Sequence, residues 1–352
     1  MQSATHLLRV PSLTSIELCA GAGGQALGLE RAGFRHTALV ELDTDAVHTL
    51  RTNRPNWNVV PADVRDLTEG GLRSTDKTVG LLAAGVPCPP FSLAGKQLGA
   101  VDERDLFPTL LNLSARLQPT AVMVENVKGI LQGKFASYRG EVLGRLAAQG
   151  YRTSWRLLRA CDYGVPQLRP RAVLIAMRPD AFAAFRWPEP TSCPETAPGV
   201  GSVLYESMAS KGWELARQWA DEAMRIAPTL CGGSRRHGGA DLGPSRARRA
   251  WAQLGINGSS VADELPLPGA SLPVRLTIGQ MALLQGFPSD WRFSGRKTSA
   301  YRQVGNAFPP PVAEAVGRSL AHALTQAETT AEDRIPHTDR VETERAGSSL
   351  RP

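Results

Sequence analysis

The first 180 residues alternate short apolar runs with segments of helical periodicity, and this alternation restricts the possible folds more than any other feature. A chain of this kind folds as a mostly parallel sheet with helices on both faces, the doubly wound α/β architecture. Five runs are predicted to be strands: Leu13–Leu18, Thr37–Glu41, Val79–Ala84, Ala121–Glu125 and Arg171–Met177. The helical segments predicted between them include Gln25–Ala32, Asp45–Asn53, Phe107–Leu117 and Gly140–Gln149.

The periodicity fades after Arg178, where Pro, Gly and Arg residues accumulate. We interpret this change as the start of a smaller, loop-rich domain, with regular helices returning only at Thr277–Leu284 and Pro311–Thr325. The polar composition after Gln326 is typical of a disordered tail. The predicted organisation is a larger α/β domain over 1–178, a smaller domain over 179–273, a segment over 274–325 that returns to the first domain, and a tail over 326–352.

Charge and cysteine usage narrow the possible partners and ligands. The 352 residues include 40 Lys+Arg against 33 Asp+Glu, a formal net charge of +7, which favours a polyanionic partner. The five cysteines form no C-x-x-C pair, so neither a zinc site nor a disulfide framework is predicted, and no metal is expected. Free thiols and the absence of any run of 18 apolar residues predict a protein of the reducing cytoplasm without a membrane span.

A glycine-rich turn, Cys19–Gly24, follows the first predicted strand and precedes a helix. Such a turn lets the backbone approach a ligand, and the helix N-terminus offers unpaired N–H groups. Glu41 ends the second predicted strand, where a carboxylate accepts hydrogen bonds from ribose hydroxyls, and Asp63 ends the next segment, where a carboxylate binds an exocyclic amine. These residues indicate a cofactor that contains adenosine, although a structural turn and two helix caps have the same appearance. The pattern does not separate a nicotinamide from a methyl donor.

The stretch GVPCPPFS places Cys88 among three prolines directly after an apolar strand. Proline fixes its own φ and disfavours helical geometry in the preceding residue, so the loop is expected to be extended and rigid. Taken alone, the stretch also fits a strand-ending turn around a buried thiol. Glu125 ends the fourth predicted strand, and Arg169 and Arg171 alternate along what is expected to be an extended segment, which would put both guanidiniums on one side. A thiol, an acid and two cations suit covalent catalysis on an electron-poor ring.

With these motifs in order, the chain resembles the DNA (cytosine-5) methyltransferases from about Ser15 to Leu324. The motifs that carry the resemblance are GAGG at Gly21–Gly24, ELD at Glu41–Asp43, ADV at Ala62–Val64, PC at Pro87-Cys88, ENV at Glu125–Val127, QLRPR at Gln167–Arg171 and RQVGNAF at Arg302–Phe308. The implied fold is the Rossmann-like, S-adenosylmethionine-dependent methyltransferase fold with a smaller target-recognition domain.

The resemblance also implies roles for the matching residues. Cys88 is the expected nucleophile at cytosine C6, and Glu125 is expected to hold and protonate N3, with Asn126 ordering the neighbouring loop. Arg171 is expected to contact the cytosine carbonyl, while Arg169 braces the site. S-adenosylmethionine is the expected cofactor, with the ribose on Glu41, the adenine amine on Asp63 and the methionine end near Asn306. The complete set carried over for the cofactor is Gly21, Gly23, Gly24, Glu41, Asp63, Val64 and Asn306.

Three residues depart from the family pattern. Pro89 follows the cysteine where relatives commonly carry Gln, which stiffens the loop and puts the manner of its closure in doubt. Cys19 stands where many relatives have Phe, and Leu42 stands where an aromatic residue often packs on adenine. None of these changes removes a reacting atom.

The recognition of DNA is expected to lie in Ala227–Trp251, which contains five arginines and one acid. Arginine reads guanine with two hydrogen bonds and also binds phosphates, so a G·C-rich duplex site is predicted. The predicted contacts are Arg235, Arg236, Arg246, Arg248 and Arg249, although a solvated basic loop has the same composition.

Several alternatives stay open at this point. A transfer-RNA cytosine-5 methyltransferase shares the fold, although that branch usually lacks a long basic recognition region. An inactive DNA-binding relative is disfavoured because Cys88, Glu125, Arg169 and Arg171 are intact. A dehydrogenase leaves the PC and ENV motifs unexplained. The partner is expected to be double-stranded DNA bound by a monomer in the cytoplasm at the nucleoid, with a cognate restriction endonuclease as a possible separate partner.

Overall fold

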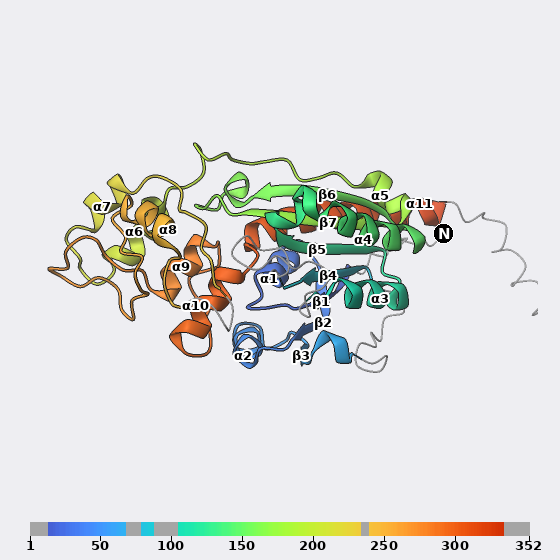
Figure 1. The fold of residues 1–352 in the computed structure, drawn as a ribbon, viewed down its shortest axis with the longest axis horizontal. Helices are drawn as coiled ribbons and strands as arrows, with labels where there is room; N and C mark the ends of the chain where they lie inside the picture. Colours follow the sequence, from blue (N-terminus) through green and yellow to red (C-terminus); the bar gives the residue numbers. More distant parts are fainter. Residues whose placement is uncertain (1–12, 68–78, 88–104, 234–238, 334–352) are drawn as a thin grey trace, which may run out of the picture.

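The computed structural model describes residues 13–67, 79–87, 105–233 and 239–333. Within them the chain forms a seven-stranded sheet in the order β3-β2-β1-β4-β5-β7-β6. The strands are β1 (Thr14–Leu18), β2 (Arg35–Glu41), β3 (Val59–Pro61), β4 (Leu81–Gly85), β5 (Ala121–Val127), β6 (Arg152–Arg159) and β7 (Pro170–Met177). The neighbouring strands from β3 to β5 pair in parallel, whereas β7 is antiparallel to both β5 and β6. The predicted doubly wound, mostly parallel sheet is therefore confirmed (Figure 1).

Helices cover both faces of this sheet. α3 (Phe107–Leu117) and α4 (Ala136–Ala148) pack on one face, against alternate residues of β1, β4 and β5. α1 (Gly24–Arg31), α5 (Pro179–Ala184) and α11 (Pro310–Asp333) pack on the other face. The central strands are buried on both sides, because their residues point alternately into these two hydrophobic layers. α2 (Thr44–Asn53) packs beside α1 at the β2 side of the sheet.

A smaller domain extends from one end of the sheet, at the left of Figure 1. Its helices are α6 (Val200–Ala209), α7 (Ala216–Glu222), α8 (Ser245–Ala252), α9 (Ile278–Leu284) and α10 (Lys297–Asn306). They share one hydrophobic cluster, in which Trp219 and Trp251 are fully buried. The region that was expected to be loop-rich thus contains four helices between residues 179 and 273, three of which belong to this domain. Each is only 6 to 10 residues long, which is shorter than the window over which helical periodicity can be recognised.

The C-terminal segment divides between the two domains. α9 and α10 contribute Met281, Leu284 and Val304 to the core of the smaller domain, whereas α11 returns to the sheet and packs along α1 and α5. The expected return of the last helix to the larger domain agrees with this arrangement.

The expectation of a disordered tail beginning at Gln326 is wrong at its start, because α11 continues to Asp333. The apolar first half of α11 is nucleated by packing on the sheet, and propagation from an existing helix adds one hydrogen bond for each residue fixed. Ala327 still packs against the core, and Ala and Glu residues with high helix propensity favour continuation of the helix. Residues 334–352 lie outside the described part of the chain.

The packing of α1 on α11 requires the absence of a side chain at Gly28. A Cβ atom there would lie 2.5 Å from the Ala313 Cβ, 2.5 Å from the Pro310 carbonyl oxygen and 2.6 Å from the Glu314 nitrogen. We expect Gly28→Ala to lower the free energy of unfolding by about 1–3 kcal/mol, because the two helices must separate. Urea unfolding followed by circular dichroism measures this change.

The same substitution at Gly144 is the matched control. This glycine lies inside α4 on its exposed side, and a Cβ atom there would have nothing within 4 Å. We expect Gly144→Ala to raise the free energy of unfolding by up to about 1 kcal/mol through helix propensity alone. Equal effects of the two substitutions would contradict the close-packing explanation.

Candidate active site

The candidate site lies where the order of strands reverses. β1 pairs with β2 on one side and with β4 on the other, so the loops that follow β1 and β4 leave the carboxyl edge of the sheet in opposite directions. Ligands of open α/β sheets bind in the crevice formed at such a switch point. The glycine turn Cys19–Gly24 follows β1, and Cys88 comes three residues after the end of β4 at Gly85. Both sequence motifs therefore begin at the same crevice.

The strand register brings Glu125 to this crevice. Glu125 is paired with Gly85 of β4 on one side and with Val173 of β7 on the other. Arg171 lies two residues before Val173, on the same face of the sheet, and its Nε is 2.7 Å from the Glu125 Oε1. Glu125 and Arg171 thus form an ion pair between neighbouring strands, and both side chains are at most 10% exposed.

Burial gives Glu125 the properties of an acid. Desolvation raises the pKa of the Glu125 carboxyl, and the nearby guanidiniums of Arg171 and Arg169 act in the opposite direction. The Arg171 Nε–H is not directed along a hydrogen bond to Oε1, so the two groups form an ion pair without a directed bond. A buried carboxyl with a raised pKa is suited to hold and donate a proton near neutral pH.

Asn126 is fully buried beside this pair. Its Oδ1 accepts a hydrogen bond of 2.8 Å from the backbone N–H of Val127, which fixes the end of β5. Its Nδ2 has no hydrogen-bond partner among the residues that the structure describes. A donor of this kind remains available to a neighbouring segment, and the ordering role expected for Asn126 stays a prediction.

Arg169 differs from the expectation of an extended backbone with two parallel guanidiniums. Its φ is 27°, so the chain turns at this residue, and its side chain is fully buried. Arg169 Nη1 donates to the Leu230 carbonyl at 2.6 Å, and Nη2 donates to the Gly305 and Ala307 carbonyls at 2.7 Å each. Arg169 therefore joins its own segment to two distant ones, at Leu230 and at Gly305–Ala307, whereas Arg171 faces Glu125.

Glu41 closes the glycine turn from the neighbouring strand. Its Oε2 accepts from the Gly21 backbone N–H at 2.7 Å, and its Oε1 accepts from the Asp43 backbone N–H at 2.7 Å. Burial raises the pKa of Glu41, while these hydrogen bonds act in the opposite direction. Leu42, the next residue, is 61% exposed, so an apolar surface lies beside the carboxylate.

Asp63 is a helix cap in the structure, and its expected contact with an adenine amine stays a prediction. It caps the short 3-10 helix Val64–Asp66 by accepting from the Arg65 backbone N–H at 2.9 Å, and it pairs with the Arg65 guanidinium at 2.6 Å. These contacts hold the pKa of Asp63 below its usual range. Val64 is buried beneath it. Burial, followed by the charges of Glu41 and Asp63, raises the pKa of the Cys19 thiol. The ends of β1, β2 and β3 lie side by side, because β2 pairs with both of the other strands.

The backbone of the RQVGNAF motif contacts the glycine turn at Phe308. A Cβ atom on Gly24 would lie 2.2 Å from the Phe308 carbonyl oxygen, so the two segments are in direct contact. Asn306, two residues earlier, is exposed and donates from Nδ2 to the Gly233 carbonyl at 3.2 Å. The predicted cofactor residue Asn306 thus lies between the glycine turn and the smaller domain.

Three predicted site residues lie outside the described part of the chain: Cys88, Arg235 and Arg236. Their neighbours Pro87 and Gly233 are described, and both precede them at the crevice side of the molecule.

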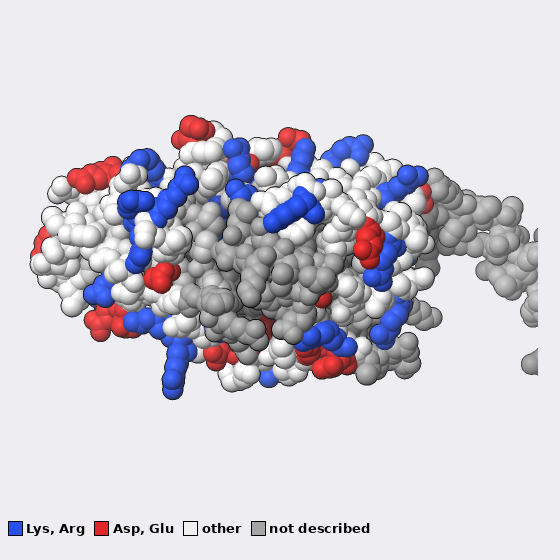
Figure 2. Space-filling view, viewed as in Figure 1, with Lys and Arg blue, Asp and Glu red and all other residues white. Residues whose placement is uncertain are grey.

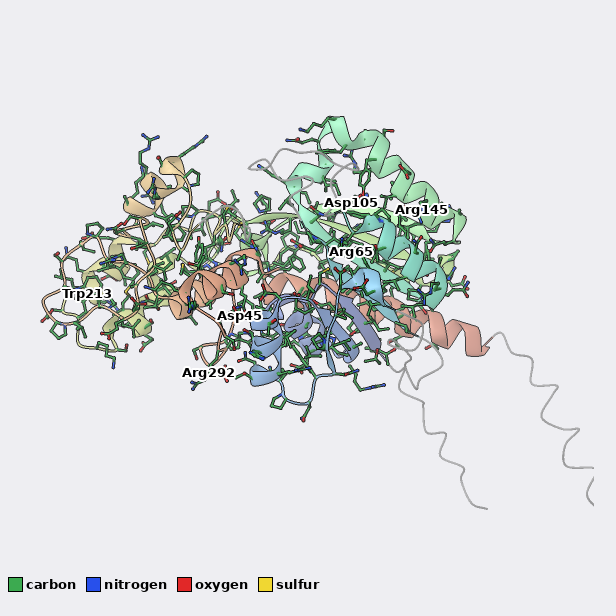
Figure 3. The ribbon with its side chains drawn as sticks, turned by 60° about the horizontal axis from the view of Figure 1, so that its bottom comes forward. Asp45, Arg65, Asp105, Arg145, Trp213 and Arg292 are labelled. Atoms are coloured by element: carbon green, nitrogen blue, oxygen red, sulfur yellow. The ribbon has the colours of Figure 1, made fainter. Side chains whose placement is uncertain are left out.

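The other three predicted DNA contacts lie on α8, which the sequence did not indicate as a helix. Arg246, Arg248 and Arg249 are all exposed there, whereas Trp251 anchors the opposite side of the helix in the core. In Figure 3 the pale orange helix α8 projects long side chains away from the smaller domain. Figure 2, which has the view of Figure 1, shows Lys and Arg side chains spread over both domains on the face toward the reader.

Two buried polar residues near the glycine turn escaped the sequence analysis. Glu17 of β1 is 1% exposed and Gln25 of α1 is 4% exposed, and burial raises the pKa of Glu17 well above its usual value. The Glu17 Oε2 and both polar atoms of the Gln25 amide have no hydrogen-bond partner in the described part of the chain. The available signal was an acidic residue between Ile16 and Leu18 in a predicted strand.

The residues at the turn fit the cofactor that the resemblance implies. A Cβ atom on Gly21 would meet nothing within 4 Å, so space for a ligand remains above the turn. Glu41, Leu42 and Asp63 offer two carboxylates and an apolar surface around it, which suits a ribose and an adenine ring.

Comparison with solved structures supports the fold class. A DNA modification methyltransferase encoded within an Escherichia coli prophage superposes with a TM-score of 0.62 at 24% identity, covering 88% of this chain and 98% of that chain. The fold is that of the Rossmann-like methyltransferases.

Sequence comparison identifies the family within this class. Residues 13–322 match the family described as C-5 cytosine-specific DNA methylase, and the chain belongs to this family. The type II methyltransferase M.NaeI of Lentzea aerocolonigenes is 54% identical over 317 residues, covering 89% of this chain and 76% of that protein. M.NgoMIV of Neisseria gonorrhoeae, also a type II methyltransferase, is 48% identical over 314 residues, covering 88% of this chain and 98% of that protein. The predicted enzyme class, DNA (cytosine-5-)-methyltransferase, is confirmed, and the RNA alternative is not favoured.

Proposed function

We propose that the protein transfers a methyl group from S-adenosylmethionine to C5 of a flipped-out cytosine in a specific, G·C-rich site of duplex DNA. The observation that carries this proposal is the buried Glu125–Arg171 ion pair beside Gly85, where the chain leads into Pro87 and Cys88. Flipping is required because a stacked cytosine hides C6, and it costs a few kcal/mol.

The proposed chemistry begins with the addition of the Cys88 thiolate to cytosine C6, which forms a C–S bond. Glu125 donates its proton to N3, so the electron pair displaced from the ring does not accumulate as charge, and C5 becomes nucleophilic. Arg171 binds the cytosine carbonyl oxygen and keeps the Glu125 carboxyl in place. When the product forms, water removes the C5 proton, the C6–S bond breaks and the thiolate leaves, and N3 returns its proton to the Glu125 carboxylate.

S-adenosylmethionine supplies the electrophilic methyl group when it is bound. We assign its binding to Gly21, Gly23 and Gly24 of the turn, to Glu41 at the ribose, to Asp63 and Val64 at the adenine, and to Asn306 at the methionine end. The hydrogen bonds of Glu41 to Gly21 and Asp43 pre-position its carboxylate for two ribose hydroxyls. Leu42 offers aliphatic contact to one face of the adenine.

We infer that α8 is part of the DNA-binding surface, together with Arg235 and Arg236. The exposure of Arg246 and Arg249 supports this inference, because neither guanidinium is needed to hold the helix in place. The Arg248 side chain starts out packed close to Gly258, so its guanidinium has a smaller range of positions than those of Arg246 and Arg249.

We expect alanine at Arg246 or Arg249 to weaken binding of the cognate duplex by more than about 1 kcal/mol, roughly fivefold. A lost phosphate contact also lowers the slope of log Kd against log salt concentration by about one, whereas a lost base contact relaxes sequence preference. Fluorescence anisotropy with labelled duplexes at several salt concentrations measures both. Arg318→Ala removes an equal charge from an exposed position on α11 and controls for net charge. If this control weakened binding as much as the α8 variants, α8 would have no specific role.

The relatives M.NaeI and M.NgoMIV are named as type II methyltransferases. We propose that this protein likewise protects DNA from a separately acting restriction endonuclease, and that it acts on DNA as a monomer in the cytoplasm. Within the described residues, no helix is both long enough and apolar enough to cross a membrane.

Bisulfite sequencing of DNA from cells that express the protein tests the proposed function. We expect complete methylation at one short sequence motif and background elsewhere. Transfer of tritiated methyl groups to duplex DNA and to transfer RNA in parallel tests the substrate class. Absence of 5-methylcytosine in DNA, or equal labelling of both nucleic acids, would refute the proposal.

A further inference from the structure

Two fully buried glutamines lie at the junction of the two domains. Gln167 precedes β7, Gln285 directly follows α9, and the Gln167 Nε2 donates to the Gln285 Oε1 at 2.9 Å. Gln285 Nε2 in turn donates to the Val304 carbonyl in α10 at 2.7 Å. Buried amides are costly to leave unpaired, so this chain of bonds holds its segments in one arrangement.

The glutamines contact the segment Ala227–Trp251, in which recognition of DNA is expected, through Leu230. We call Ala227–Trp251 the recognition segment. The Leu230 backbone N–H donates to the Gln167 Oε1 at 2.8 Å, and the Leu230 carbonyl accepts from Arg169 Nη1 at 2.6 Å. Both polar groups of this one residue are therefore bound by the short segment that also contains Arg171. We call Gln167, Arg169, Gln285 and Leu230 the junction clamp.

The chain that leaves the junction clamp is held closely for three more residues. Gly232 lies against Gly305, where a Cβ atom on Gly305 would be 2.4 Å from the Gly232 Cα. Asn306 then binds the Gly233 carbonyl. These contacts connect the segment that contains Arg171 to residues 230–233 of the basic segment Ala227–Trp251.

We propose that Gln285, through Gln167, is a positioning residue for target recognition. The junction clamp fixes where the recognition segment starts relative to Arg171 and Glu125, so that a base pair read by the smaller domain sets the position of the cytosine in the active site. Gln285 touches no reacting atom in this proposal. The proposal rests on the function proposed above, since it concerns the choice of DNA site by that reaction.

The physical reason for an effect on specificity is rigidity. A mismatched base pair typically costs about 1–3 kcal/mol only when the reading groups cannot shift to avoid the mismatch. Once the Leu230 segment moves, non-cognate DNA loses part of this penalty, whereas cognate DNA loses part of its alignment. The values of kcat/KM for cognate and for non-cognate DNA should therefore become more similar.

The test compares Gln285→Met with Gln280→Met in the full-length protein. Gln280 lies in α9, is equally buried, and bonds to Thr277 and Met208 but not to the junction clamp. kcat and KM are measured on a duplex with the methylated motif from bisulfite sequencing and on one with a single base pair of that motif changed. We expect Gln285→Met to lower the ratio of the two kcat/KM values about tenfold, mainly through a higher KM for cognate DNA, while Gln280→Met leaves the ratio unchanged.

Binding of S-adenosylhomocysteine and the melting temperature are measured for each variant, so that misfolding is recognised. A folded Gln285→Met protein with the wild-type ratio would overturn the proposal, and so would an equal fall of the ratio in Gln280→Met. If the wild-type protein methylated no DNA, the proposed function itself would fail, which is a distinguishable result.

Gln285→Glu provides an independent measurement if Gln285→Met does not fold. A carboxylate still accepts from Gln167, but it donates to the Val304 carbonyl only when it is protonated. At each pH the ratio of the two kcat/KM values is compared between Gln285→Glu and wild type. We expect the ratio of the variant to come closer to that of wild type as the pH falls. A ratio independent of pH and equal to that of wild type would contradict the role of this bond.

Discussion

Cys88→Ala is expected to abolish methyl transfer and to abolish covalent trapping on a duplex with 5-fluorocytosine at the target. In the proposed chemistry the wild-type thiolate adds to C6, and fluorine at C5 cannot leave as a proton does. The adduct therefore persists and migrates as a protein–DNA conjugate on a denaturing gel. Cysteine is the side chain best suited to this addition near neutral pH, since a few per cent of it is already thiolate.

Cys193→Ala is the matched control for this experiment, because it removes a half-buried thiol whose hydrogen-bond partner is Thr196 and not a residue of the crevice. It is expected to trap the DNA as well as wild type does. An adduct that survives in Cys88→Ala, or the lack of one in wild type, would refute the assignment of the nucleophile.

Glu125→Gln is expected to lower the single-turnover rate of methylation by about 10²–10⁴-fold, the usual range for the loss of acid–base assistance. Glutamine keeps the size of the side chain and still bonds to the ring, but it cannot transfer a proton to N3. The pKa of Glu125 is raised by burial, against the effect of Arg171 and Arg169. The protonated form is therefore lost as the pH rises through that raised pKa, and the wild-type rate should fall with it.

The pH profile separates a chemical role from a structural one. In Glu125→Gln the fall at high pH should disappear, because the titrating group is gone. Glu141→Gln changes an exposed carboxyl on α4 and should leave both rate and profile unchanged. Rapid-quench assays from about pH 6 to 9, a range that brackets neutrality, with a melting temperature for each variant, measure these effects. A Glu125→Gln variant with the wild-type rate would show that N3 is protonated by another group.

The elements that the sequence predicted are those with strong apolar patterns. All five predicted strands and the helices between them are present, because the central strands are buried on both faces and read as continuous apolar runs. β3 escaped prediction because it has three residues, and β6 escaped because it is an edge strand with exposed arginines. The sequence RTSWRLLR has no clear alternation, and its strand pairing is made by β7.

Chain order alone also determined which residue types meet at the crevice. Motifs that follow parallel strands lie at one edge of a sheet, so the turn after β1 and the ends of β2, β4 and β5 were expected at the same edge. This reasoning holds for Glu41 and Glu125 irrespective of their side-chain contacts.

Only the tertiary structure decided what the two arginines of QLRPR do. The alternation of Arg169 and Arg171 predicted similar positions, but the positive φ at Arg169 turns its side chain into the junction clamp, while Arg171 pairs with Glu125. Such a choice depends on carbonyls of Leu230, Gly305 and Ala307, which are far away in sequence. Local sequence sets strand and helix by nearby propensity and burial, whereas a buried cation takes its partners from whichever backbone groups the completed fold leaves unpaired.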